Sequence, residues 1–484
     1  MPFARERYGW DGRHSREMPL RPWPSLGIGL LVILSGCADG RTDVSLTAPQ
    51  STDLPSTTTT ASLAGSTTVP QDEELAELRV VDPMTLDALS NGPVFTVGGS
   101  IEASASSGEL VAIVERPWVE SKIEPFRLWL LNLNSGRQQL VATGGEEWVL
   151  ALGFTSEGNL RWVEANGAPG GFAVFEVDVS SGDVRELISH PQAFGPSEVL
   201  FLDDGSLAVF GYDLNSPELP RVVVVDLREA RLTVDLALPE LGPRYTEGRP
   251  TEVEVAWDLE GNLLYGPIEA FPGITVVDLA TGEQQVHHIE AMSSWLDRLM
   301  AAWVPVAHAK GPTASRAVEL SPDRNTIYLT GSTSDFSPEG ILEATTPTGV
   351  VAVTMDTFRE TARIDADIDH VTAIPGGMWL LGTGGTTVRT GEALWVTEGS
   401  GLFVLDPATL DVAAHWDPFD FEDGYGFDFS PDGRIAYAIP NVAPAPIRII
   451  DLETLAATEH QPDSLDWWSA PLLRYGLGMF RREG

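Results

Sequence analysis

The sequence predicts an all-β fold in which four-stranded antiparallel sheets follow one another along the chain. Three observations predict it. A tight turn between two apolar runs recurs through most of the chain, a second kind of turn alternates with it, and most intervals between turns are too short for a crossover helix.

The first recurring unit joins two apolar runs by a tight turn, as in "GFTSEGNLRWV" and "FDFSPDGRIAYA". Most copies have a glycine after Asp, Glu or Ser, and these residues favour tight hairpin turns. Seven copies occur, centred on Gly108, Gly158, Gly205, Gly261, Asn325, Gly377 and Gly433.

The second unit is an apolar strand, a polar turn and a shorter, more polar strand, as in "VDLATGEQQV". It alternates with the first unit, so each period supplies two hairpins, which together form a four-stranded sheet. The polar residue after the apolar strand is Asn132, Asp178, Asp226, Asp278, Thr354, Asp406 or Asp451, and an earlier copy has Asp82.

Four strands in each period of about 50 residues are typical of a β-propeller. Seven complete pairs of turns predict seven four-stranded blades. The additional strand at Leu78 to Asp82 is expected to pair with the last blade and close the ring, which would remove an exposed edge. The alternative is an eighth blade that combines Leu78 to Leu89 with "SLDWWSAPLLRYGLGMF" near the carboxyl end.

Between residue 78 and about residue 460, the units "FSPDGRIAYA" and "VDLATGEQQV" resemble those of WD-repeat-like and YVTN-type β-propellers. The resemblance implies the propeller fold. It implies no particular function, because propellers carry many unrelated activities.

The amino-terminal segment has the features of an export signal. Its apolar run, "LGIGLLVIL", follows Arg21 and is too short to span a bilayer, which takes about 20 residues. The run leads into "LSGC", in which Leu34, Ser35 and Gly36 precede Cys37, the single cysteine of the chain.

This order resembles the lipobox of bacterial lipoproteins. The resemblance implies that residues 1–36 are removed as a signal peptide, that Cys37 carries a lipid, and that the mature protein is anchored to the membrane outside the cytoplasm. Residues 1–17 form a long polar lead, so we expect synthesis to begin at Met18.

Residues 37–77 are rich in Ser, Thr and Pro and contain almost no aromatic or long apolar residues. Such a segment cannot bury enough apolar surface to offset the entropy of ordering, so it is predicted to be a disordered linker. The propeller domain is predicted to span 78–484.

The chain is strongly acidic, with 30 Lys and Arg against 70 Asp and Glu and a net charge of −40. A field of this sign repels phosphate backbones, so no nucleic-acid partner is expected.

The strands of each blade can be named A to D from the centre outward. The A–B and C–D turns then share one face of the propeller (the turn face), and the B–C and D–A loops share the other (the loop face). The long insertions fall on the loop face, at 116–126, 241–251, 288–315, 331–348 and 384–401. Insertions that gather on one face usually mark the binding face.

The predicted binding residues are aromatic and histidine side chains of the loop face, since aromatic rings suit contacts with sugars or proteins. They are Trp118, Trp295, Trp303, His308, Trp395, His415 and Trp416. The apolar residues of "SSWLDRLMAAWVP" fall at helical spacing, with Ser294 and Asp297 as a capping box, which predicts a short amphipathic helix before Pro305.

One acidic segment, "HWDPFDFEDGYGFDF", could hold calcium through Asp417, Asp420, Glu422 and Asp423. Their spacing does not match an EF-hand loop, and a solvated acidic loop is the alternative. No other cofactor is predicted.

The sequence contains no HExxH, serine-nucleophile elbow or Walker-type loop, so it favours binding over catalysis. The first hypothesis is a lipid-anchored module that binds or scaffolds an envelope protein, peptide or glycan. The alternative is a propeller enzyme, a lactonase-like hydrolase or a lyase, with a metal or acid–base site at the mouth of the channel. A third hypothesis is a solute-sensing module beside a transporter.

Overall fold

The computed structural model describes residues within 76–481, all of them in one compact unit, Thr52–Gly484. The signal peptide, with Leu34, Ser35 and Gly36, and the lipidation site Cys37 lie outside the described residues, as does the linker up to residue 75. Within 76–481 the residues outside the description are 120–121, 146, 166–169, 191–193, 203–204, 214–215, 239–240, 242–243, 247–248, 252–254, 259–261, 269–271, 290–312, 338–341, 391–394, 419–424, 441–445 and 462–471.

The prediction of an all-β propeller fold is confirmed: the described residues form strands, together with a short 3₁₀ turn at 472–475. In this part of the chain no helix has the length and apolar character needed to cross a membrane. The predicted helix before Pro305 lies outside the described residues.

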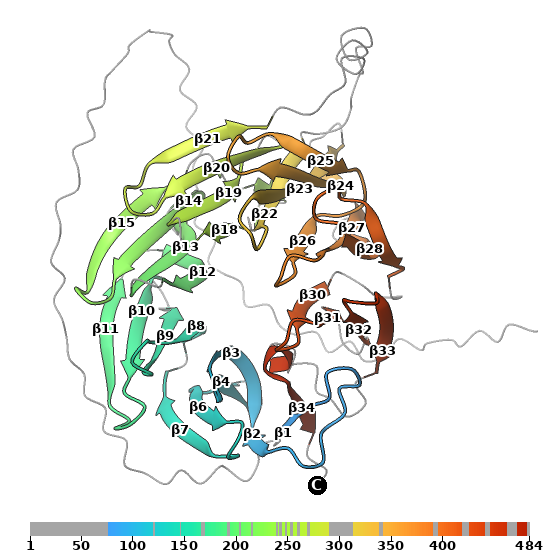
Figure 1. Cartoon of the computed structure of the whole chain (residues 1–484). Coiled ribbons are helices and arrows are strands. Elements are labelled where there is room, and N and C mark those ends of the chain that lie inside the picture. Colours follow the sequence, from blue (N-terminus) through green and yellow to red (C-terminus); the bar gives the residue numbers. More distant parts are fainter. Residues whose placement is uncertain are drawn as a thin grey trace, which may run out of the picture. The chain divides into compact units, whose positions relative to one another are not determined.

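Seven four-stranded antiparallel units follow one another in the described part of the chain, and the fifth and sixth are joined into one eight-stranded sheet (Figure 1). We number them as sheets 1 to 7. Sheet 1 comprises β3 (Gly99–Ser107), β4 (Leu110–Val119), β6 (Arg127–Asn132) and β7 (Gln138–Thr143), with β5 (Lys122–Ile123) paired to β4. Sheet 2 comprises β8 (Val149–Phe154), β9 (Leu160–Ala165), β10 (Phe172–Val177) and β11 (Val184–His190). Sheet 3 comprises β12 (Phe194–Phe201), β13 (Ser206–Asp213), β14 (Ser216–Asp226) and β15 (Arg231–Ala237).

The remaining four sheets continue in chain order. A two-stranded hairpin, β16 (Arg244–Thr246) and β17 (Arg249–Thr251), precedes sheet 4. Sheet 4 comprises β18 (Ala256–Asp258), β19 (Leu263–Pro267), β20 (Gly273–Asp278) and β21 (Gln284–His288). Sheet 5 comprises β22 (Thr313–Leu320), β23 (Thr326–Phe336), β24 (Leu342–Thr354) and β25 (Glu360–Ile364). Sheet 6 comprises β26 (His370–Ala373), β27 (Leu380–Arg389), β28 (Trp395–Leu405) and β29 (Val412–Trp416). Sheet 7 comprises β30 (Tyr425–Phe429), β31 (Ile435–Pro440), β32 (Ile447–Asp451) and β33 (Ala456–His460).

The two ends of the described chain meet in a three-stranded sheet, which we call the closing sheet. β1 (Ala76–Val80) pairs with β2 (Val94–Val97) on one side and with β34 (Leu477–Arg481) on the other. We expected the strand at Leu78 to pair with the last blade. Its partners are instead β2 and the carboxyl-terminal strand, the segment that the alternative hypothesis combined with it. β34 buries Leu477 and Met479 and follows a turn in which Gly476 has positive φ. Tyr475 stands where most other copies of this turn have Asp, Glu or Ser, so the repeat pattern does not reveal this pairing.

Apolar clusters join each sheet to the next one along the chain. Sheets 3 and 4, for example, share a cluster that contains Phe210, Val224 and Leu264. The closing sheet packs on sheet 7 through Val81 and Leu86 and on sheet 1 through Leu78 and Phe95. The core is therefore a succession of interfaces between sheets, and burial of their apolar side chains is the main stabilising contribution.

The tight A–B turns that the structure describes form where the sequence predicted them, and Gly261, the predicted centre of the turn in sheet 4, lies outside the described residues. A residue with positive φ occupies each turn, and glycine supplies it at Gly108, Gly158, Gly205, Gly377 and Gly433. In the turn assigned to Asn325, the residue with positive φ is Arg324, at +56°. The backbone N–H of Asn325 instead donates to Ser321 Oγ and to Asp323 Oδ1, and each of these hydrogen bonds is 3.2 Å long.

In the C–D turns other than that at Thr354, whose hydroxyl bonds with that of Thr357, the polar residue after the apolar strand caps the turn. Asp278 Oδ1 accepts hydrogen bonds from the backbone N–H groups of Ala280 (2.8 Å) and Thr281 (2.9 Å), which hold the pKa of Asp278 below its usual range. The same pair of hydrogen bonds occurs at Asp82, Asn132, Asp178, Asp226, Asp406 and Asp451. Residues of this type recur in the sequence because they satisfy turn N–H groups that no strand partners.

A carboxylate on strand A of every second sheet accepts a hydrogen bond from the sheet or turn that follows it. Glu319 of sheet 5 accepts a hydrogen bond from the Ala373 N–H of sheet 6 (2.8 Å). Between sheets 3 and 4, Glu198 accepts one from Trp257 Nε1 (3.0 Å). Glu102 accepts an N–H hydrogen bond in the same way between sheets 1 and 2, and Asp428 of sheet 7 accepts one from Arg474, in the turn before β34. Each bond satisfies a polar group at an otherwise apolar interface.

His190, at the end of β11, is buried without a hydrogen-bond partner. Its ring stacks on Phe172 and meets Phe194 edge-on, with centroids 5.2 and 6.2 Å apart, and neither ring nitrogen has a partner among the described residues. Burial lowers the pKa of His190, and the positive charge of nearby Arg221 lowers it further. The negative charge of Asp235 raises the pKa but does not outweigh these two effects. The ring is therefore neutral at pH 7.

His190 makes stability depend on pH. Its pKa is lower in the folded protein than the usual 6.5, so the unfolded chain binds a proton that the folded protein excludes. The free energy of unfolding should therefore fall as the pH drops below 6.5, by at most about 1.4 kcal/mol per pH unit for this group. In His190→Leu, urea midpoints should fall less between pH 7 and pH 5 than in the wild type. Equal falls in the two proteins would contradict this assignment.

Candidate functional site

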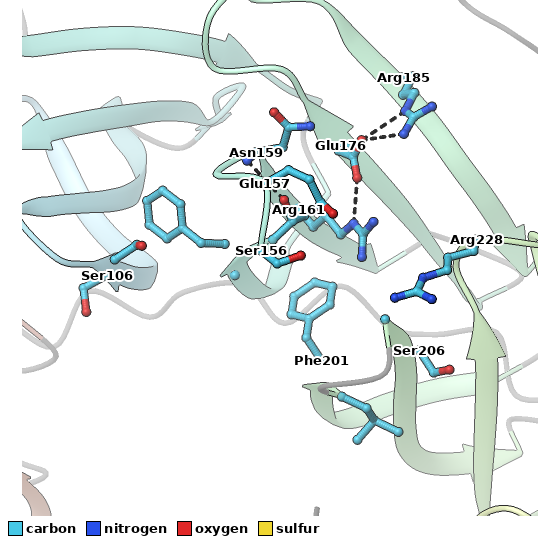
Figure 2. Close-up of a pocket in the computed structure, with 16 residues that line it drawn as sticks. Ser106, Ser156, Glu157, Asn159, Arg161, Glu176, Arg185, Phe201, Ser206 and Arg228 are labelled. Carbon is cyan, nitrogen blue, oxygen red and sulfur yellow. Dashed lines mark hydrogen bonds and ion pairs between the residues drawn. The ribbon is translucent and has the colours of Figure 1, made fainter.

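A cavity of about 660 Å³ opens on the turn face, mainly between sheets 2 and 3. Its walls come from the A–B turns of sheets 1, 2 and 3, from β10 and β11, and from the C–D turn of sheet 3 (Figure 2). The size suits a small molecule. Three arginines and several hydroxyl groups line it, in a chain whose net charge is −40.

A row of charged side chains forms one wall. Arg161 (β9), Glu176 (β10) and Arg185 (β11) lie side by side in register across sheet 2. Glu176 accepts hydrogen bonds from Arg161 Nε (2.7 Å) and Arg185 Nη2 (2.5 Å), as the dashed lines in Figure 2 show. The Glu176 side chain is 6% exposed, whereas that of Arg185 is 64% exposed. The row therefore runs from a buried carboxylate to an exposed cation.

The charged row replaces an apolar one. Glu176 lies two residues before the polar residue of its C–D turn, and this position is apolar in every other sheet: Leu130, Val224, Val276, Ala352, Val404, Ile449 and Val80. In sheets 1 and 3 to 7, the residues opposite this position on the two neighbouring strands are uncharged. Residues at this position otherwise pack against the next sheet, as Val224 does in the cluster between sheets 3 and 4.

Both carboxylates of the cavity are ionised at neutral pH. Burial alone would raise the pKa of Glu176, but the hydrogen bonds and charges of Arg161 and Arg185 outweigh it and lower the pKa. The pKa of Glu157 is lowered by hydrogen bonds from its own backbone and from Ser156 and Thr155. Neither group is poised to exchange a proton near pH 7, so the arrangement suits binding rather than acid–base chemistry.

Arg228 faces the charged row from the C–D turn of sheet 3 (Figure 2). Its guanidinium lies against Gly205, where an added Cβ would be 3.1 Å from Arg228 Nε. Its guanidinium makes no hydrogen bond or ion pair with any described residue. Arg228 is also the only cation two residues after the polar residue of a C–D turn. The lack of a side chain at Gly205 thus leaves room for an available cation at the cavity edge.

The remaining walls are polar and aromatic. Ser106 and Ser107 end β3, Asn159 belongs to the turn before β9, and Phe154 and Phe201 add ring surface. An added Cβ on Gly153 would lie 2.8 Å from the Phe201 ring, so glycine permits the ring to pack there. The cavity can therefore offer a ligand hydrogen bonds and an apolar contact together.

The predicted binding residues that the structure describes lie outside this cavity. Trp118 lies near the end of β4, before a B–C loop, and Trp395 begins β28, after another B–C loop. His415 and Trp416 are the last residues of β29, an outer strand, and do not belong to the following loop. His415 stacks on Phe403 with 4.2 Å between centroids and is hydrogen-bonded to Ser400 O (2.9 Å). Trp295, Trp303 and His308 lie outside the described residues.

Two of the predicted insertions are extended hairpins. β23 with β24, and β27 with β28, continue beyond their sheets, and the two hairpins pair at Ala344 with Val388 and at Thr345 with Thr387. The insertion 288–315 lies largely outside the described residues.

Of the proposed calcium ligands, Asp417 is exposed after β29, and Asp420, Glu422 and Asp423 lie outside the described residues. Among the residues that the structure describes, no group of three or more His, Cys, Asp or Glu side chains could hold a metal ion.

The long insertions of the sequence gather on the loop face, so the predicted binding face was the opposite one, and the cavity on the turn face was missed. A usable signal was present: aligning the C–D turns places Glu176 alone at a position that is otherwise apolar. Such a departure from the repeat is where function is expected.

No family model and no curated protein matches the chain. Among solved structures, it is similar to the dihydro-heme d1 dehydrogenase NirN in complex with DHE, with a TM-score of 0.45 and 12% identity over 85% of this chain and 74% of that one. It is similar to the β-propeller domain of the Trilobed protease from Pyrococcus furiosus (TM-score 0.39, 12% identity, 74% and 97% covered). It is also similar to a 6-phosphogluconolactonase-like protein from Bacteroides uniformis (TM-score 0.38, 13% identity, 80% and 95% covered). Identities this low carry no information on ligand or reaction.

Substitutions in the charged row should separate its structural and functional roles. Glu176→Ala leaves the mostly buried Arg161 without its acceptor and should lower the free energy of unfolding by about 1.5–3 kcal/mol. The triple variant Arg161→Ala, Glu176→Leu, Arg185→Gln introduces the residues that sheet 1 has at these places. It should be as stable as the wild type or more stable, because an apolar replacement of a buried ion pair is often neutral or stabilising.

Urea unfolding at pH 7 measures both effects. Glu229→Ala is the control, because Glu229 forms an exposed pair with Arg231 and its loss should change stability by less than about 0.5 kcal/mol. If the triple variant were as unstable as Glu176→Ala, the charged row would be a requirement of the fold.

Proposed function

We propose that this protein is a binding module of the cell envelope, held outside the cytoplasm by a lipid on Cys37, and that the cavity between sheets 2 and 3 is its ligand site. The observation that carries the binding role is the charged row, because it occupies a place that is apolar in every other sheet. A fold gains no stability from that replacement. Such a departure is retained where it serves binding.

The chemistry of the cavity supports binding in a second way. Glu176 neutralises one of its two arginine partners and holds both guanidinium groups in place. Side chains fixed by their neighbours lose little freedom when a ligand arrives, which favours affinity. Arg228, Ser106 and Ser107 have side chains that bond to none of the described residues, so they can contact a ligand without breaking an interaction seen there.

The location outside the cytoplasm rests on the resemblance of "LSGC" to a lipobox. In a bacterial host that processes lipoproteins, wild-type protein should sediment with membranes and be released only by detergent. Cys37→Ser removes the sulfur that carries the lipid, so this variant should appear in the soluble fraction. Ser35→Ala keeps the cysteine and a small residue before it, and should remain with the membranes. Membrane association of Cys37→Ser equal to that of the wild type would refute the anchor.

The ligand site can be tested with a thermal-shift panel of small molecules that are anionic, neutral and cationic. A ligand present at one hundred times its Kd adds about 2.7 kcal/mol to the free energy of unfolding, so Tm should rise. The same compound should leave Tm unchanged in the triple variant of the charged row, which is expected to fold. If the panel raises Tm in neither protein, or equally in both, the cavity is not the ligand site.

A further inference from the structure

We propose that the ligand of the cavity is a small organic anion that carries one acidic group and several hydroxyl groups, of the class of sugar acids and sugar phosphates. This inference rests on the proposed binding function of the same cavity. It depends on three features of the described residues: the charge of the lining, its free hydrogen-bonding groups and its aromatic surface.

The charge of the lining favours a single anionic group. Glu176 offsets one of the charges of Arg161 and Arg185, with which it is paired. Arg228 adds a further positive charge. Glu157, exposed in the A–B turn of sheet 2, adds a negative one and stays ionised at neutral pH. The five side chains together carry a net charge of about +1 at pH 7. One carboxylate neutralises the site, and one phosphate group, with a charge of about −1.5 to −2 at pH 7, is also attracted to it.

The position of Arg228 identifies it as the cation that contacts the ligand. The guanidinium groups of Arg161 and Arg185 already donate to Glu176. The guanidinium of Arg228 lies against Gly205 at the edge of the cavity and donates to none of the described residues. Its planar fork can bind a carboxylate or a phosphate through two parallel hydrogen bonds.

The remaining groups indicate a ligand with hydroxyl groups. Ser106 and Ser107 present hydroxyls and Asn159 an amide, and in the described part of the chain these side chains have no hydrogen-bond partner. Hydroxyls and amides both donate and accept, as a ligand hydroxyl does. The rings of Phe154 and Phe201 can cover the C–H face of a sugar. An aliphatic anion would leave these polar groups unpaired, which costs affinity.

Size and overall charge exclude a polyanion. A cavity of about 660 Å³ is in the range of small-molecule sites. The chain carries a net charge of −40, so an extended polyanion would meet repulsion beyond the three arginines.

Isothermal titration of the full mature chain at pH 7 tests the proposal with five probes: D-glucuronate, D-glucose 6-phosphate, D-glucose, acetate and inorganic phosphate. D-Glucuronate or D-glucose 6-phosphate should bind, and comparison of the two identifies carboxylate or phosphate as the preferred group. D-Glucose, acetate and inorganic phosphate should each bind at least about 10-fold more weakly than the better sugar anion, because each lacks one of the two kinds of contact.

Two matched variants locate the binding. Arg228→Gln removes the charge and should weaken binding of the sugar anion by about 10- to 100-fold. It should leave Tm unchanged, since the Arg228 side chain bonds to none of the described residues. Arg137→Gln changes an exposed arginine in the C–D turn of sheet 1 and should leave the affinity unchanged.

The outcomes separate this inference from the proposed function. Equal affinity for a sugar anion and for acetate or inorganic phosphate, or an unchanged affinity in Arg228→Gln, overturns the ligand class. If no anion binds but a neutral or cationic compound of the thermal-shift panel binds in a manner that depends on the charged row, the ligand class fails and the binding function stands. If no compound binds, both fail.

Discussion

Every sheet of this protein must bury a face against the next sheet, and the rest of the structure depends on this constraint. The strands can satisfy it with a repeated pattern, in which an apolar strand leads to a polar residue that caps its turn, as Val276 leads to Asp278. Because the polar turn residue follows the apolar strand at a constant spacing, the apolar residues of each period lie at the same distance from the turn. The closing sheet obeys the same pattern, with Val80 and Asp82.

Polar groups enter these interfaces in two different ways. Glu198 and Glu319 each accept a hydrogen bond from the neighbouring sheet, so they connect sheets while the apolar packing around them is kept. The charged row of sheet 2 is different, because Glu176 is paired within its own sheet and the space toward sheet 3 stays open. The first arrangement satisfies a polar group at the interface, and the second gives up apolar packing to form a cavity.

Local chemistry explains how much the sequence could predict. The turns at Gly108, Gly158 and Gly433 were found because a few neighbouring residues determine them, and the all-β propeller fold followed from their repetition. The partner of β1 could not be found in this way, because β34 lies roughly 400 residues away and Gly476, in the turn before it, follows Tyr475 rather than Asp, Glu or Ser. The cavity depends on which residue fills one position of the repeat, so a comparison of turn lengths could not reveal it.

The topology also sets the direction in which the cavity opens relative to the chain that precedes β1. Ala76 is at the end of β1 opposite its C–D turn, so the preceding segment joins at the loop face. The cavity opens on the turn face. A lipid on Cys37, the anchor proposed above, would thus attach to the propeller through a segment that joins at its loop face. The cavity would then be on the face away from the point of attachment, where a soluble ligand has access even when the loop face lies against the membrane.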